Sequence, residues 1–352
     1  MVKTAPRIDF GRRMVVLRAG NRVSVRIGLR TPAVIAVLLA ASAVVAVFAL
    51  GTGEYQLSPT TVVQAVFGDS TRLAEFVVMD LRMPRVLLAL LLGAALGASG
   101  AIFQSLTRNP LGSPDVIGFN FGAYTGALIV MLIFGGGYRQ TALGALIGGI
   151  ATAAIVYMLS LKGGMQGFRL IIAGIAISTM LQSVNVWLLM KMDVNTAMAA
   201  AVWGSGSLTG LDWSQVTPVA IALVALLPGV LWLAYRMPLL ELGDDTARAL
   251  GIRLEPTRLA AVLVGVALTA VATAAAGPIA FLSLAAPQLA RRLTRSATVA
   301  PVPSAALGAL LLLLSDWIAQ RAFAPTQLPV GVVTVSVGGA YFVWLLAREA
   351  RQ

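Results

Sequence analysis

Apolar residues occur along this chain in long uninterrupted runs, unlike the 3.6-residue or two-residue patterns of helices and strands in soluble domains. A run of about 20 apolar residues is long enough to cross the ~30 Å hydrocarbon core of a bilayer as a helix. The pattern therefore predicts membrane-spanning helices over Ala33–Leu50, Val86–Thr107, Val116–Phe134, Thr141–Leu161, Leu170–Met190, Trp213–Tyr235, Val299–Trp317 and Leu328–Ala347.

The longest uncharged stretch runs from Leu259 to Ala290 and contains Gly277-Pro278. As one helix it would measure about 48 Å, which exceeds the thickness of the bilayer core. Because proline lacks an amide hydrogen and breaks helices, we expect two spans here, the second ending near Arg291. The prediction is an all-α integral membrane protein with ten transmembrane helices over residues 33–352, after a basic tail over residues 1–32.

The charge distribution predicts the orientation of these spans. Only 11% of the residues are charged, yet the net charge is +12. With a cytoplasmic N-terminus, the outer segments carry only the basic residues Arg72, Arg82, Arg85, Arg139, Lys191 and Arg321. Lys and Arg favour the cytoplasmic side, so we expect both termini in the cytoplasm of a bacterium and the chain in its inner membrane. The basic tail is then an uncleaved, poorly ordered cytoplasmic segment rather than a nucleic-acid-binding region.

Composition removes several kinds of chemistry. The chain has no cysteine and no histidine, which excludes disulfides, thiolate or imidazole catalysis and most transition-metal sites. Its lysines are Lys3, Lys162 and Lys191, and none follows a glycine, so no P-loop for ATP exists. We expect no catalytic residue, no metal site and no cofactor in this chain. If the chain pumps, the energy comes from a partner or an ion gradient.

Small residues and prolines mark two features of the second span. Gly93, Gly97 and Gly100 recur at a spacing that lets helices pack closely in lipid. At its cytoplasmic end, Arg108–Asp115 holds two prolines and a glycine, which cannot continue a helix. This segment is either a short turn between spans or a gate beside a water-filled path, because irregular backbone at membrane depth needs protein or water around it.

Two further segments have two readings each. Residues 237–253 mix leucines with acids and bases and predict short amphipathic helices with turns at Gly243 and Gly251, either a solvated connector or a docking element for a cytoplasmic partner. Outside, Arg82, Arg85 and Arg321 either reach toward lipid headgroups or bind carboxylates of an external partner. Asp316, five residues before Arg321, is a candidate local partner for that arginine.

Several blocks resemble the iron-siderophore and vitamin B12 importer permease family, especially its ferric enterobactin permease subunits. They are Leu81–Arg85, Gly93–Gln104, Asn109–Gly112, Gly243–Gly251, Gly277–Phe281 and Leu328–Thr334. The resemblance covers nearly the whole chain after residue 33. It implies a type II ABC importer permease with ten spans per subunit, a second permease subunit (homodimer or heterodimer), two cytoplasmic ATP-binding subunits that hold ATP and Mg, and an external siderophore-binding protein.

The resemblance also implies residue roles. Arg82, Arg85 and Arg321 would form salt bridges with the binding protein. The cytoplasmic gate would include Asn109, Pro110 and Leu111, faced by Gly167 and Phe168. The segment that contacts the ATPase would include Leu239, Glu241, Leu242, Gly243, Asp244, Asp245, Ala247, Arg248, Leu250 and Gly251. The chain departs from the family at Gln288, where Pro-His is common, and at the bulky Phe168.

The expected function is import of a ferric siderophore by alternating access. Haem or cobalamin could use the same scaffold. A gradient-driven secondary transporter is the rival from another class, but it needs carboxylates inside the membrane, and the apolar runs contain few. A purely structural membrane subunit or channel is a further alternative.

Overall fold

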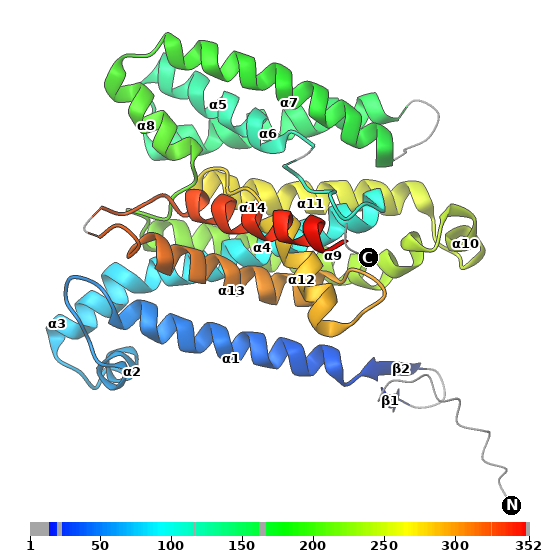
Figure 1. The fold of residues 1–352 in the computed structure, drawn as a ribbon, viewed down its shortest axis with the longest axis horizontal. Coiled ribbons are helices and arrows are strands. Elements are labelled where there is room, and N and C mark those ends of the chain that lie inside the picture. The colour runs from blue at the N-terminus through cyan, green and yellow to red at the C-terminus, as the bar shows by residue number, and fades with distance from the viewer. Residues whose placement is uncertain (1–13, 20–22, 116, 162–166, 325, 350–352) are drawn as a thin grey trace, which may run out of the picture.

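The computed structural model of the chain is a bundle of long, roughly parallel helices, with a small β-hairpin beyond one end of α1 (Figure 1). It describes residues 14–19, 23–115, 117–161, 167–324 and 326–349. Ten helices correspond in order to the ten predicted spans: α1 (Arg30–Gly51), α4 (Met83–Thr107), α5 (Phe119–Phe134), α6 (Tyr138–Ser160), α7 (Gly167–Met190), α9 (Trp213–Glu241), α11 (Leu254–Ala276), α12 (Leu282–Thr294), α13 (Pro301–Ala319) and α14 (Val330–Glu349).

These helices differ in length. Among the described residues, seven helical stretches are long and apolar enough to cross a membrane. The apolar helix α5 and the stretch Val330–Tyr341 of α14 are shorter, and α12 has 13 residues. The all-helical membrane architecture is therefore confirmed, whereas ten full crossings remain a prediction.

Helix α4 runs through the centre of the bundle, against α13, α11, α9 and α12. A Cβ atom at Gly97 would collide with the carbonyl oxygen of Ser304 in α13, and one at Gly100 with that of Ser283 in α12. Gly93 faces Gly308 of α13 in the same way. The glycine spacing thus allows the close backbone approach that the sequence predicted.

The expected helix break at Gly277-Pro278 is also present. α11 ends at Ala276 and α12 begins at Leu282, with positive φ angles at Gly277 (75°) and Phe281 (67°). As a result α12 begins well inside the bundle rather than at its surface. The layer of α5, α6, α7 and α8 (Val194–Gly204) lies on one side of α11 and α14, and α1, α12 and α13 lie on the other (Figure 1).

The described part of the N-terminal tail contains a β-hairpin that the sequence did not predict. Strands β1 (Met14–Ala19) and β2 (Val23–Gly28) pair antiparallel, with Val16 opposite Arg26. The hairpin precedes α1, and the elements from α1 onward are all helical. The alternation in Val-Ser-Val-Arg-Ile has the two-residue period of a strand, a signal that the many arginines of this segment concealed.

The segment over residues 237–253 also differs in detail. α9 continues past Tyr235 to Glu241 although it contains Pro238. Prolines are tolerated in transmembrane helices because neighbouring groups satisfy the freed carbonyl. The first part of the segment is therefore the last turn of α9, and only α10 (Asp244–Ala249) is a separate short helix, placed between Gly243 and Gly251 with their positive φ angles as predicted.

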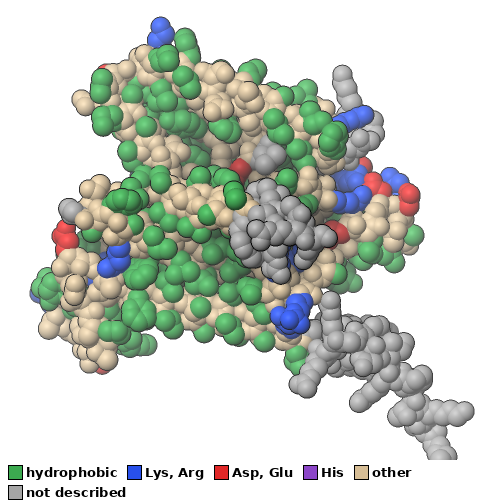
Figure 2. Space-filling view, viewed as in Figure 1, with side chains coloured by type: hydrophobic (Ala, Val, Ile, Leu, Met, Phe, Trp, Pro, Cys, Tyr) green, Lys and Arg blue, Asp and Glu red, His purple; other side chains and the backbone are tan. Residues whose placement is uncertain are grey.

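Short helices that the apolar runs did not predict occupy the opposite end. They are α2 (Pro59–Phe67), α3 (Arg72–Glu75), the π-helical turn η1 (Phe76–Arg82) and α8. Side chains cap three of them: the hydroxyl of Ser58 accepts from the amide of Thr61 at 3.1 Å, that of Thr71 from Ala74 at 3.4 Å, and the Asp193 carboxylate from Thr196 at 3.1 Å. Figure 2 shows charged side chains gathered mainly at the α10 end, while apolar side chains cover the flanks of the helices.

Candidate functional site

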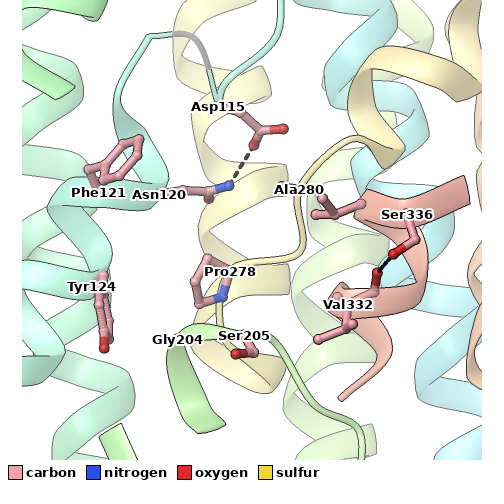
Figure 3. A pocket seen from close by; sticks show the side chains of 12 residues that line it. Asp115, Asn120, Phe121, Tyr124, Gly204, Ser205, Pro278, Ala280, Val332 and Ser336 are labelled. Carbon is pink, nitrogen blue, oxygen red and sulfur yellow. Dashed lines mark hydrogen bonds between the residues drawn. The ribbon is translucent and has the colours of Figure 1, made fainter. Parts of the chain in front are cut away.

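A cavity of about 420 Å³ lies between α5, the end of α8 and α14 (Figure 3). Its walls come from four separate parts of the chain, including the break between α11 and α12. The lining residues are Asp115, Asn120, Phe121, Tyr124, Gly204, Ser205, Pro278, Ala280, Gly331, Val332, Val335 and Ser336. The lining thus combines apolar side chains with hydroxyls, an amide and the Asp115 carboxylate.

Asp115 joins three segments at the top of this cavity (Figure 3). Its carboxylate accepts from the Asn120 amide at 2.5 Å and from the Ser283 hydroxyl at 3.1 Å, and also from the backbone amide of Phe281. These contacts tie the α4–α5 connection to the start of α12. The sequence did not predict this role, although an acid directly after Pro114 and before an apolar run was a usable signal.

The predicted gate segment begins where α4 ends. Asn109 forms a local turn, since its side-chain oxygen accepts from the Leu111 amide at 2.9 Å. Gly167, at the start of α7, packs against the backbone of Thr107, the last residue of α4. Phe168 has an exposed side chain. The structure therefore brings Gly167 to the end of α4 beside this turn; residues 162–166 lie outside the described residues.

A second cavity of about 190 Å³ places gate and coupling residues on shared walls. Its lining residues are Gln104, Arg108, Asn109, Pro110, Glu241, Gln288, Arg291 and Val299. On its wall, the Gln288 amide donates to the side-chain oxygen of Gln104 at 2.6 Å, and Gln104 donates to the carbonyl of Leu284 at 3.0 Å. Gln288 thus links α12 to α4 through neutral amides.

The predicted coupling residues surround α10 and differ in exposure. Leu242 and Leu250 present exposed apolar side chains, whereas Ala247 is buried beneath them. Glu241 accepts from the hydroxyl of Ser105 in α4 at 2.5 Å. Asp245 and Arg248 form an exposed pair at 3.4 Å within α10. The leucines and this pair form an outward surface of the kind that a soluble partner can bind.

Asp244 points toward the helical bundle, away from this outward surface of α10. It pairs with Arg108 at 2.5 Å and with Arg258 at 2.7 Å. Burial tends to raise the pKa of this carboxyl, but hydrogen bonds and charge from Arg108 and Arg258 outweigh burial, so the pKa of Asp244 lies below its ordinary value.

The three outer arginines have different surroundings. Arg82 donates to the carbonyls of Leu50 and Tyr55. Arg85 pairs with Asp316 at 2.9 Å, so this acid is the partner of Arg85 and not the local partner expected for Arg321. The guanidinium of Arg321 lies 5.5 Å from the ring centre of Trp317 and is exposed. The different exposure of these side chains separates the arginines into internal and outward-facing groups.

Comparison with known proteins decides the family. The model of the FecCD transport family matches residues 38–348. The chain belongs to the FecCD transport family. It is 50% identical over 315 residues to the ferric enterobactin transport system permease protein FepG of Escherichia coli, covering 90% of this chain and 96% of FepG. It is 37% identical to the iron(3+)-hydroxamate import system permease protein FhuG of Bacillus subtilis, over 90% of this chain and 96% of FhuG.

A solved structure supports the same assignment. It is described as an inward-facing conformation of a metal-chelate type ABC transporter, with a TM-score of 0.80, 27% identity, and coverage of 90% of this chain and 99% of that one. This FecCD chain is therefore a multi-pass membrane permease with the helical arrangement of that ABC transporter.

Proposed function

We propose that this chain is the permease subunit of an ATP-driven importer that carries a ferric siderophore into the bacterial cytoplasm across the inner membrane. The observation that carries the proposal is the 50% identity to the ferric enterobactin permease over nearly the full length of both chains. FhuG, whose name specifies iron(3+)-hydroxamate, is similar over the same extent. A large iron chelate is the cargo class that these relatives share.

The geometry of the two ends supports alternating access. One end carries α10 with its exposed leucines, where we place the ATPase; the other carries Arg321 and the short helices, where we place the external binding protein. ATP binding would move α10, and the segment Asn109–Leu111 would open or close the path from the 420 Å³ cavity. A second permease subunit, identical or related, would complete the path, with both termini in the cytoplasm.

Uptake measurements in a deletion strain test the cargo. We expect the strain to lose uptake of ⁵⁵Fe bound to a catecholate siderophore and to regain it with the intact gene. Labelled haem and cobalamin serve as competing cargoes in the same strain. Loss of haem or cobalamin uptake with unchanged uptake of all ferric siderophores would contradict the proposal.

A further inference from the structure

One carboxylate connects the coupling helix to the end of the central helix. Asp244 is the first residue of α10, and its oxygens accept three hydrogen bonds: one from Arg108 at 2.5 Å and two from Arg258 at 2.7 and 2.8 Å. Arg108 directly follows α4, and Arg258 lies in the first turns of α11. We call Arg108, Asp244 and Arg258 the Asp244 cluster.

Exposure distinguishes Asp244 from its neighbour. The side chain of Arg258 is 11% exposed and that of Asp244 is 34% exposed, whereas Asp245 is fully exposed. Asp245 pairs with Arg248 of its own helix. Adjacent acids in one coupling helix therefore point to different places: Asp245 toward solvent and Asp244 into the bundle.

Arg108 makes the link to the gate segment direct. It adopts a left-handed backbone conformation (φ 50°) as the C-cap of α4, and it directly precedes Asn109 and Pro110. Its Nε atom donates to the carbonyl of Leu240 in the last turn of α9 at 2.9 Å. The guanidinium of Arg108 thus contacts both the end of α9 and the start of α10. The next residue, Asn109, is the first of the gate segment.

We propose that Arg108 and Asp244 act as a strut that makes the gate segment move together with α10, so that they are positioning residues rather than ATPase contacts. The inference rests on the proposed function. Without the strut, motion of α10 would reach the end of α4 only through single hydrogen bonds and through the turn at Gly243, which is more flexible than a salt bridge. The charge-assisted hydrogen bonds from Arg108 and Arg258 to Asp244 are stronger, so they make the end of α4 follow a displacement of α10 more closely.

The test uses the whole complex, reconstituted with its ATPase and binding protein in vesicles. The variants are Asp244→Asn, Arg108→Gln and the double variant, with Glu255→Gln as the matched control. Glu255 also pairs with Arg258, at 3.6 Å, but is 60% exposed and has no contact with Arg108 among the ion pairs of the described residues. Three quantities are measured: ATPase retained on purification, ATP hydrolysed, and ferric siderophore imported per ATP hydrolysed.

We expect Asp244→Asn to retain the ATPase and hydrolyse ATP within about twofold of the unmodified complex, and to import at least about fivefold less per ATP. The double variant should lose no more than either single variant, because the two residues act as a unit. Asp244→Glu, which keeps the charge, should restore most of the import, and it serves as the second variant if Asp244→Asn folds poorly. Glu255→Gln should keep the import ratio.

Three outcomes overturn the strut. If Asp244→Asn imports as much per ATP as the unmodified complex, the strut is refuted while the proposed function stands. If the ATPase is lost from the purified complex instead, Asp244 is a docking contact. An unmodified complex that hydrolyses ATP without importing any ferric siderophore would refute the proposed function and the strut with it.

Discussion

At the residue scale, the three arginines predicted to dock an external protein separate by their surroundings. Arg85 is 14% exposed and pairs with Asp316, whose side chain is 2% exposed. Arg321 stacks beside Trp317 and stays exposed. Their positions at the outer ends of predicted spans suggested one role for Arg85 and Arg321. The sequence does not show which arginine faces an acid on a neighbouring helix.

The matched variants Arg85→Met and Arg321→Met should therefore affect different properties, the first stability and the second import. Arg85→Met removes the charged partner of the buried Asp316, which keeps only the hydrogen bond from Gln320, and should lower the free energy of unfolding by about 3 kcal/mol. Arg321→Met should leave stability unchanged and reduce import that depends on the binding protein. Thermal unfolding in detergent and uptake in cells measure the two effects. Equal loss of stability in both variants would contradict this division.

The Asp244 cluster also predicts a pH dependence. The pKa of Asp244 is lowered in the folded chain. Above the ordinary carboxyl pKa of about 3.9, the side chain is ionised in both folded and unfolded states, so the stabilisation is fully present. It is lost only as the pH falls through the lower pKa of the folded state. Titration of Asp244 should thus cause no change in import per ATP between about pH 8 and pH 5; a marked decline within that range that Asp244→Asn abolishes would contradict the assignment.

At the element scale, the apolar runs predicted most of the bundle, and Pro278 correctly divided the longest run. Other elements depended on information that hydropathy lacks. α8 begins at the capping residue Asp193, and α9 passes through Pro238 because the surrounding bundle tolerates it. The Gln104–Gln288 link and the Asp115–Ser283 contact join residues far apart in sequence, so no local pattern indicated which residues pair.

The close packing of α4 leads to a prediction about glycines. Gly97→Ala should lower the free energy of unfolding by about 1–3 kcal/mol, because the new methyl group meets the backbone of Ser304, which cannot rotate away. Gly339→Ala in α14 is the control, since a Cβ atom there has no neighbour within 4 Å among the described residues. Chemical unfolding of the two purified variants compares them. A more damaging Gly339→Ala would show that the bundle packs differently.

At the scale of the whole molecule, the chain places a cavity between two helical layers, the short helix α10 at one end and an exposed arginine at the other. The family assignment and the 0.80 TM-score agree with that arrangement. The helices and family could be predicted from the sequence, but the inward direction of Asp244 and the internal pairing of Arg85 required the fold. These contacts distinguish charged side chains that are paired within the bundle from those that are exposed on its surface.

The central claim is ATP-driven import of a ferric siderophore, and transport into reconstituted vesicles tests it most directly. Vesicles containing this chain with its partner subunits, and supplied with the binding protein loaded with ⁵⁵Fe-siderophore, should accumulate iron only when ATP reaches the ATPase side. An ionophore that dissipates proton and sodium gradients should leave this accumulation unchanged. Accumulation that proceeds without ATP and stops when the gradients are dissipated would contradict the account.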